Sequence, residues 1–226
     1  MTRPYAVLTR RWLAYQRGLI MSIKITWLGH ASVMITHGQF TIYIDPWKLK
    51  GPFPKADIVL VTHDHFDHYN EEDVLKVFSE KTRVIAPMSI PLITDKVKPG
   101  DELTIGGATI EATPSYNVDK VFHPKANGWV GYIVTMDNKR IYHTGDTDRI
   151  PEMKNIQADI VLMPVGGTYT MDVCTAKEAT DDIKPSLVIP IHYGDIVGSR
   201  KDAERFKQVS TANVQILNPG DTYNMD

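Results

Sequence analysis

The chain has 226 residues, of which 42% are hydrophobic and 23% are charged, and its formal net charge is −2. These values are typical of a globular protein of one domain, and they exclude disordered and collagen-like chains. The balanced charge argues against nucleic acid as a partner, and no apolar run reaches the length of a membrane-spanning helix. Cys174 is the only cysteine, so no intramolecular disulfide can form, and we expect a reducing, cytoplasmic location.

The first twenty residues differ in composition from the rest of the chain. They contain four arginines and no acidic residue. Arg17 and Lys24 interrupt the apolar stretch that an export signal would need. We therefore predict that residues 1–20 are an extension outside the fold and that one domain covers residues 21–226.

The first half of this domain contains short β-branched runs separated by Gly, Pro and Asp. This pattern predicts strands at residues 23–28, 32–36, 40–44, 57–62 and 83–86. The run 57–62 is continuously apolar, as expected for a strand that is buried on both faces. A helix should follow Asn70, which is a suitable N-cap, because Glu71 and Glu72 would lie at the positive end of its dipole.

The second half predicts two hairpins and then buried strands alternating with helices. The hairpins are 103–105 with 108–113 and 129–135 with 140–142, and the later strands are 159–163, 187–191 and 214–217. A capping box from Thr175 to Glu178 predicts the start of one helix, and residues 199–209 should form the last one. This mixture of meanders, buried strands and helices indicates an α/β (α+β) fold.

Polar residues gather directly after four of the predicted strands. The clusters are 62–65, 142–146, 164–167 and 191–194, and each is rich in His, Asp or Gly. In folds that mix helices and strands, strand ends often bring distant parts of the chain to one site. We therefore expect these four clusters to converge.

The segment His63–His68 has the composition of a metal site. It holds three of the eight histidines and two carboxylates in six residues, which is enough to begin two sites for zinc, manganese or iron. His63 and His65 can share one metal, because alternate residues of an extended segment point the same way. Asp67 and His68 could face a second metal. The alternative is a solvated polar loop whose histidines cap a helix.

The motif His63-x-His65-x-Asp67-His68 after a strand resembles the signature of the metallo-β-lactamase fold superfamily of binuclear hydrolases. Residues 26–34, together with Asp45-Pro46, are similar to the branch that contains the UPF0173-type metal-dependent hydrolases and the N-acyl-phosphatidylethanolamine phospholipases. The resemblance implies a four-layer αβ/βα sandwich of two mixed β-sheets, with the site at one edge.

The same resemblance implies further site residues. Residues 142–147 resemble the strand that carries the metal-bridging aspartate, here Asp146, and residues 190–194 resemble the late histidine segment, here His192. Taken alone, either residue could have a purely structural role. His143 is expected to support the site from its strand. We expect His30 to lie behind the ligands or to face the substrate, and Asp45 to steady the ligands from outside.

One segment departs from the family pattern. Related phospholipases have a metal-binding histidine in a Thr-Pro-Ser-x-His segment, whereas residues 113–117 end in Asn117. His123, six residues later, is our preferred replacement, and a histidine of a surface loop is the alternative role for it. If His123 is not a ligand, Asn117 could supply an amide oxygen, which is a weaker ligand for zinc.

Two divalent ions held by this set would generate hydroxide from water at neutral pH, with Asp67 as the catalytic residue that orients it. Zinc is the preferred ion, and manganese, iron and nickel are alternatives. We expect a small-molecule substrate with a phosphodiester, lactone or other ester-type bond. Whether the protein forms a homo-oligomer stays an open question at this point.

Two other functions stay open. The first is a di-iron oxygen or redox enzyme on the same fold. His65 argues against it, because the flavodiiron branch of the family has glutamate at that place. The second is a metal-binding module without hydrolytic activity, which the departure at Asn117 suggests.

Overall fold

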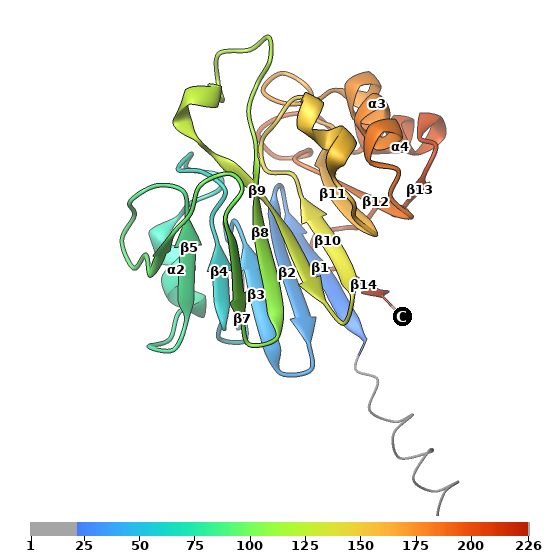
Figure 1. The fold of residues 1–226 in the computed structure, drawn as a ribbon. Helices are drawn as coiled ribbons and strands as arrows, with labels where there is room; N and C mark the ends of the chain where they lie inside the picture. Colours follow the sequence, from blue (N-terminus) through green and yellow to red (C-terminus); the bar gives the residue numbers. More distant parts are fainter. Residues whose placement is uncertain (1–21, 226) are drawn as a thin grey trace, which may run out of the picture.

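The computed structural model describes residues 22–225, so the predicted extension at residues 1–20 lies outside the described part. Two seven-stranded sheets form the centre of the molecule (Figure 1). Their strand orders are β14-β1-β2-β3-β4-β5-β6 and β13-β12-β11-β10-β9-β8-β7. Within the described residues, no helix combines the length and the apolar character that crossing a membrane requires.

The bounds of the elements follow the predicted order closely. The strands are β1 Ile23–Gly29, β2 Ser32–His37, β3 Phe40–Ile44, β4 Ile58–Leu60, β5 Arg83–Ala86, β6 Asp95–Lys96, β7 Glu102–Ile105, β8 Ala108–Pro114, β9 Val130–Met136, β10 Lys139–His143, β11 Ile160–Pro164, β12 Leu187–Ile191, β13 Asn213–Val214 and β14 Thr222–Met225. The helices are α2 Glu71–Val77, α3 Val173–Ile183 and α4 Arg200–Val209, with short 3-10 turns η1 Lys125–Asn127 and η2 Pro151–Asn155.

Both sheets are mixed and share one pattern. In the first, β14, β1, β2 and β3 pair antiparallel, and β3, β4, β5 and β6 pair parallel. In the second, β7 to β10 pair antiparallel and β10 to β13 pair parallel. The carboxyl ends of parallel strands meet at one edge of a sheet. This topology explains how the polar clusters that follow β4, β10 and β12 can reach one place.

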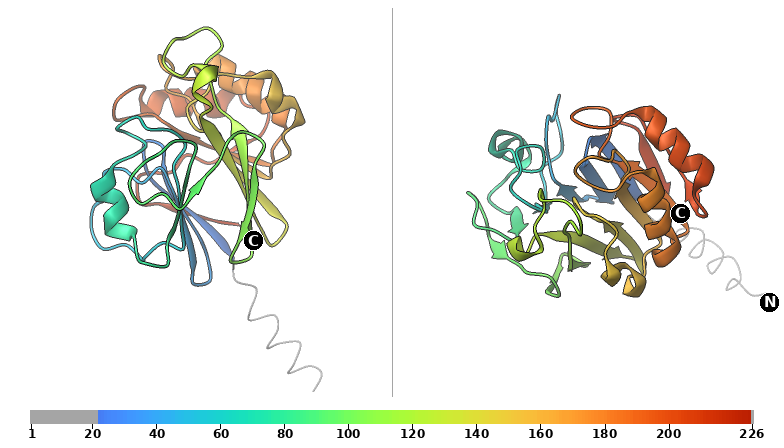
Figure 2. Two further views of the ribbon diagram at one scale, coloured as in Figure 1. Left: turned by 60° about the vertical axis from the view of Figure 1, so that its left-hand side comes forward. Right: turned by 90° about the horizontal axis from the view of Figure 1, so that it is seen from above.

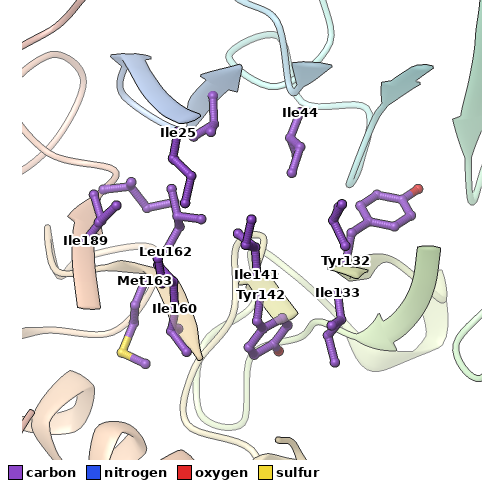
Figure 3. Close-up of a cluster of buried hydrophobic side chains, with 14 of the residues drawn as sticks. Ile25, Ile44, Tyr132, Ile133, Ile141, Tyr142, Ile160, Leu162, Met163 and Ile189 are labelled. Carbon is purple, nitrogen blue, oxygen red and sulfur yellow. The ribbon is translucent and has the colours of Figure 1, made fainter. Parts of the chain in front are cut away.

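The main core lies between the two sheets. Figure 3 shows Ile25 and Ile44 of the first sheet pointing toward Leu162 and Ile141 of the second. Helices cover the outer faces: α2 packs against the first sheet, and α3 and α4 pack against the second. Figure 2 shows α2 and the α3–α4 pair on opposite sides of the molecule. The predicted sandwich of two mixed sheets between helices is confirmed.

Local capping explains where two helices begin. The side chain of Asn70 accepts a hydrogen bond from the backbone N–H of Asp73 at the start of α2, as predicted. The predicted capping box of α3 was wrong by three residues. Asp172 is the N-cap, and Thr175 is its partner in the third helical position rather than the cap itself. The carboxylate of Asp172 accepts the Thr175 N–H at 2.8 Å, so the helix starts earlier in the chain.

The end of the chain also differs from the prediction. Of the predicted strand 214–217 only Val214 is in β13, whereas Thr222–Met225 forms β14, which the sequence analysis missed. β14 pairs with β1, nearly 200 residues away, and only Met225 of its four residues is buried. Its residues alternate between polar and apolar, but four residues are too few for a reliable local signal, and the pairing with β1 determines the strand. The two-residue strand β6 was missed for the same reason.

A buried hydroxyl connects the two sheets and can be tested. Tyr132 of β9 donates a hydrogen bond to the carbonyl oxygen of Val61, directly after β4, at 2.9 Å. We expect Tyr132→Phe to lower the free energy of unfolding by about 1–2 kcal/mol, because a buried carbonyl loses its donor. Tyr223→Phe is the control, since that hydroxyl has no hydrogen bond among the described residues. Equal urea denaturation midpoints for Tyr132→Phe and the wild type would contradict this assignment.

Candidate metal centre

Seven candidate ligands meet at the edge of the sandwich where the parallel strands end. They come from the loops after β4, β8, β10 and β12, and all except His65 are buried: His63, His65, Asp67, His68, His123, Asp146 and His192. The predicted cluster at residues 164–167 provides none of these candidate ligands, and its Gly166 allows a close approach of the backbone. A Cβ on Gly166 would lie 2.3 Å from the carbonyl oxygen of His192, so only glycine fits there.

The candidate ligand atoms form three overlapping groups. Within each group, the atoms lie within 4.8 Å of one another. The groups are His63, His65 and His123; His63, His68 and Asp146; and His30, Asp67, His68 and His192. Because His63 and His68 each belong to two groups, the three groups form one continuous cluster.

Asp146 lies at the centre of this cluster. Its Oδ1 is 3.3 Å from His68 Nε2, and its Oδ2 is 3.0 Å from His192 Nε2 and 3.3 Å from His123 Nε2. One carboxylate therefore faces imidazoles from three different loops. The placement agrees with the bridging position that the resemblance implied for Asp146.

Unpartnered nitrogens show that the site fits metal ions. The Nε2 atoms of His63, His68, His123 and His192 are buried, and none of them makes a hydrogen bond of regular geometry among the described residues. Those of His68, His123 and His192 face the carboxylate of Asp146, at 3.0–3.3 Å. A buried polar atom without a full hydrogen bond is costly, by about 1–3 kcal/mol when it has no partner at all, and a cation bound among these nitrogens would satisfy them. Imidazole nitrogens and carboxylate oxygens are the donors that zinc and similar divalent ions prefer.

Asp45 and Thr62 orient two of these imidazole rings. Asp45 accepts hydrogen bonds from the Thr62 N–H at 2.8 Å, the Thr62 hydroxyl at 2.7 Å and His68 Nδ1 at 2.7 Å. Since the hydroxyl gives its proton to Asp45, its oxygen accepts from His63 Nδ1 at 2.9 Å. Both rings therefore turn Nε2 toward the cluster. Sequence analysis placed Asp45 but missed Thr62, whose one signal is its position just before His63.

Asn117 holds His123 in the same way. Its side-chain oxygen accepts hydrogen bonds from the backbone N–H of His123 at 2.9 Å and from His123 Nδ1 at 3.0 Å, and its amide donates to the Tyr169 carbonyl at 3.0 Å. His123 is only 1% exposed, so it is not a surface-loop histidine. The oxygen of Asn117 is already used by His123, which leaves the alternative of a ligand from Asn117 without geometric support.

His30 and His143 lie behind the ligands. His30 Nε2 is 3.0 Å from Asp67 Oδ2, and the His30 carbonyl accepts the backbone N–H of His192 at 2.8 Å. His143 Nε2 donates to the carbonyl of Ala31 at 2.8 Å, while its Nδ1 accepts the N–H of Gly145 at 3.2 Å. Because backbone groups occupy both of its nitrogens, His143 ties β10 to the turn between β1 and β2.

The electrostatics favour neutral imidazoles at His63 and His65, an ionised carboxylate at Asp146 and the charged form of His68. Burial lowers the pKa of His63 well below its usual value and also lowers the pKa of His65. Burial alone would raise the pKa of Asp146, but His192 and His68 hold it well below its usual value. For His68, burial opposes the charged form, yet the carboxylates of Asp146 and Asp45 raise its pKa well above the usual value.

Comparison with known proteins identifies the family. Residues 24–192 match the family model described as the Beta-lactamase superfamily domain. A UPF0173 metal-dependent hydrolase of Methanoregula boonei is 34% identical over 218 residues, which cover 88% of this chain and 97% of that relative. The chain therefore belongs to the β-lactamase superfamily and, within it, to the UPF0173 family.

Solved structures support the same assignment. A structure from Parabacteroides distasonis is 34% identical with a TM-score of 0.76, covering 86% of this chain and 92% of that chain. Igni18, described as a metallo hydrolase from Ignicoccus hospitalis, is 27% identical with a TM-score of 0.75, covering 91% and 99%. The resemblance inferred from the His63–His68 motif is thus confirmed.

The hydroxyl of Thr62 can be tested by its effect on metal affinity. Thr62→Val keeps the shape of the side chain but removes the bond from His63 and one bond to Asp45, so we expect zinc affinity to fall about 10–100-fold. Thr62→Ser keeps the hydroxyl and should retain most of the affinity. Zinc retained during dialysis against a weak chelator measures both variants. Equal retention by Thr62→Val and the wild type would exclude this role.

Proposed function

We propose that the protein is a hydrolase that binds two divalent metal ions and cleaves a phosphodiester, lactone or other ester-type bond in a small-molecule substrate. The observation that carries the proposal is the position of Asp146 between two sets of donors. His63, His65 and His123 form one group of donors, Asp67, His68 and His192 belong to another, and Asp146 contacts members of both, His123 in the first and His68 and His192 in the second. Zinc is the preferred ion for such a set, and manganese, iron and nickel are alternatives.

Divalent ions in such a site supply a nucleophile from water near neutral pH and stabilise negative charge on the oxygen of the scissile group. The side chains of the protein prepare this chemistry. The Oδ2 atom of Asp67 lies 3.0 Å from His30 Nε2, 3.8 Å from His68 Nε2 and 3.9 Å from His192 Nε2, and we assign this carboxylate the role of orienting the attacking water. His30 fixes the direction of that carboxylate through the 3.0 Å contact. Burial of the ligands excludes bulk water from the donors.

The same reasoning extends to partners and location. The balanced charge of the chain favours a small molecule over nucleic acid. The single cysteine, Cys174, is exposed on α3 and unpaired, which is consistent with the cytoplasmic location that we propose. Assembly into a homo-oligomer is compatible with this function and is not required by it.

Metal removal tests the function. We expect chelation with EDTA to abolish turnover of p-nitrophenyl esters or bis(p-nitrophenyl) phosphate, and added zinc or manganese to restore it. His63→Ala should lose both turnover and bound metal, while circular dichroism shows a retained fold, because the core is large enough without metal. Turnover by metal-free protein would refute the mechanism.

The same metal-loaded samples discriminate the two other functions. Two bound ions without turnover of any ester or phosphodiester would favour a metal-binding module. A coupled di-iron signal in electron paramagnetic resonance, on protein purified without oxygen, would favour redox chemistry.

The His123 loop gives a separate test of the ligand set. His123→Ala removes an imidazole, so we expect the loss of one metal ion per chain after dialysis against a weak chelator. Asn117→Ala removes only the acceptor that orients His123, so it should keep both ions with affinity lowered about 10–100-fold at one site. Metal stoichiometry decides: the loss of one ion from Asn117→Ala and none from His123→Ala would assign the ligand to Asn117.

A further inference from the structure

A cavity of about 620 Å³ lies beside the metal centre, on the outer face of the first sheet. Leu28 of β1 and Met34 of β2 line it from the sheet, and Trp47 and Phe53 line it from the segment between β3 and β4. This volume is within the range of pockets that bind small molecules, and such pockets are mainly apolar. None of these four side chains belongs to the proposed ligand set.

The cavity adjoins the metal cluster through His30 and Trp47. Both residues line the cavity, and their ring centroids are 5.3 Å apart. On its other side, His30 contacts Asp67 at 3.0 Å. The buried side chain of His30 therefore forms the wall between the cavity and the cluster, and the two lie one side chain apart.

An exposed aromatic residue continues this apolar surface to the metal ligands. Phe66 is 69% exposed although it stands between His65 and Asp67, and its ring centroid is 6.1 Å from that of Trp47. Trp47 and Phe66 thus form an apolar surface from the cavity to the cluster.

The charges nearby favour a neutral ligand over an anionic one. Lys48 lines the cavity, but its Nζ lies 2.8 Å from the carboxylate of Asp195 and 4.1 Å from the ring of Trp47. Lys120, in the loop that carries His123, is likewise paired with Asp148. Lys50, the other lysine of the lining, is exposed to solvent. A phosphate group would have to compete with carboxylates for two of these three cations.

We propose that this cavity binds the apolar acyl or alkyl group of a neutral ester-type substrate while the scissile bond lies at the metal cluster. This proposal rests on the proposed hydrolytic function and narrows it to esters, thioesters or lactones with an apolar chain. The chain would pack against Leu28, Met34 and Trp47, and Phe66 would cover its entrance. Phosphodiesters become the less favoured substrates.

Turnover of p-nitrophenyl acetate, butyrate and octanoate by the zinc-loaded full chain tests the proposal. We expect kcat/KM to rise about fourfold for each methylene that enters the cavity. Met34→Trp fills the cavity and should lower the octanoate-to-acetate ratio of kcat/KM at least tenfold. Leu75→Trp is the matched control, because Leu75 is 49% exposed on α2 and does not line the cavity, so its ratio should equal that of the wild type.

Binding of the neutral dye Nile red gives a readout that does not depend on hydrolysis. Wild type and Leu75→Trp should bind the dye, and octanol should displace it, whereas Met34→Trp should bind at least tenfold more weakly at equal metal content. Metal content and circular dichroism show whether Met34→Trp is folded. Leu28→Phe is a second variant that fills less of the cavity, and it should also weaken dye binding.

The outcomes separate this proposal from the proposed function. Ester turnover without chain-length preference, or dye binding unaffected by both filling variants, would overturn the cavity assignment and leave the hydrolase intact. Absence of all hydrolysis, with dye binding that Met34→Trp abolishes, would reject the hydrolase and with it the substrate assignment. If the protein elutes as a dimer in size-exclusion chromatography and binds no dye, the cavity is occupied by a second copy of the chain, and the proposal is overturned.

Discussion

The buried carboxylate of Asp45 is the group on which the geometry of the metal centre depends. It follows β3 with a φ of 48°, in the left-handed region, and it is fully buried. A buried carboxylate must be hydrogen-bonded, and here Thr62 and His68 supply all three donors. Because the Thr62 hydroxyl also accepts a hydrogen bond from His63, Asp45 orients two imidazole rings: that of His68 directly and that of His63 through Thr62. The first sheet therefore builds its half of the site around a residue that lies outside the candidate ligand groups.

The second sheet contributes in a parallel way. Asp146 follows β10 and His192 follows β12, two strands that both pair with β11 in parallel. A backbone hydrogen bond of 2.8 Å from His192 to His30 joins this half to the first sheet, and His143 adds the bond to Ala31. The site is thus held by contacts between the sheets as well as within them. Ligands on such rigid supports keep their positions, which a metal site with catalytic function requires.

Two different environments meet at His30. One ring nitrogen faces the polar cluster through Asp67, whereas the ring itself lines an apolar cavity beside Trp47. The polar side can activate a reacting bond, and the apolar side can discriminate among the groups attached to that bond. In the function that we propose, this arrangement separates chemistry from substrate selection.

The local signals in the sequence were sufficient for most of the fold and for the family. Hydrophobic runs predicted nearly all central strands, and the segment His63–His68 identified the metal centre, because ligand spacing within an extended segment is a local property. The pairing of β14 with β1, the capping of α3 by Asp172 and the contribution of Thr62 were not predictable. Each depends on a partner or on a choice between competing acceptors.

The candidate site likewise combines features that the sequence determined with features that depend on the tertiary structure. The sequence by itself determined that His123 and Asn117 were the two candidates for the missing histidine, since they are the chemically suitable residues near position 117. Only the tertiary structure decided between their positions. It turns the loop inward, buries His123 beside Asp146 and uses the oxygen of Asn117 to hold the ring. The physical reason is that His123 and Asp146 lie in different loops, and their contact forms only after the second sheet has brought those loops together.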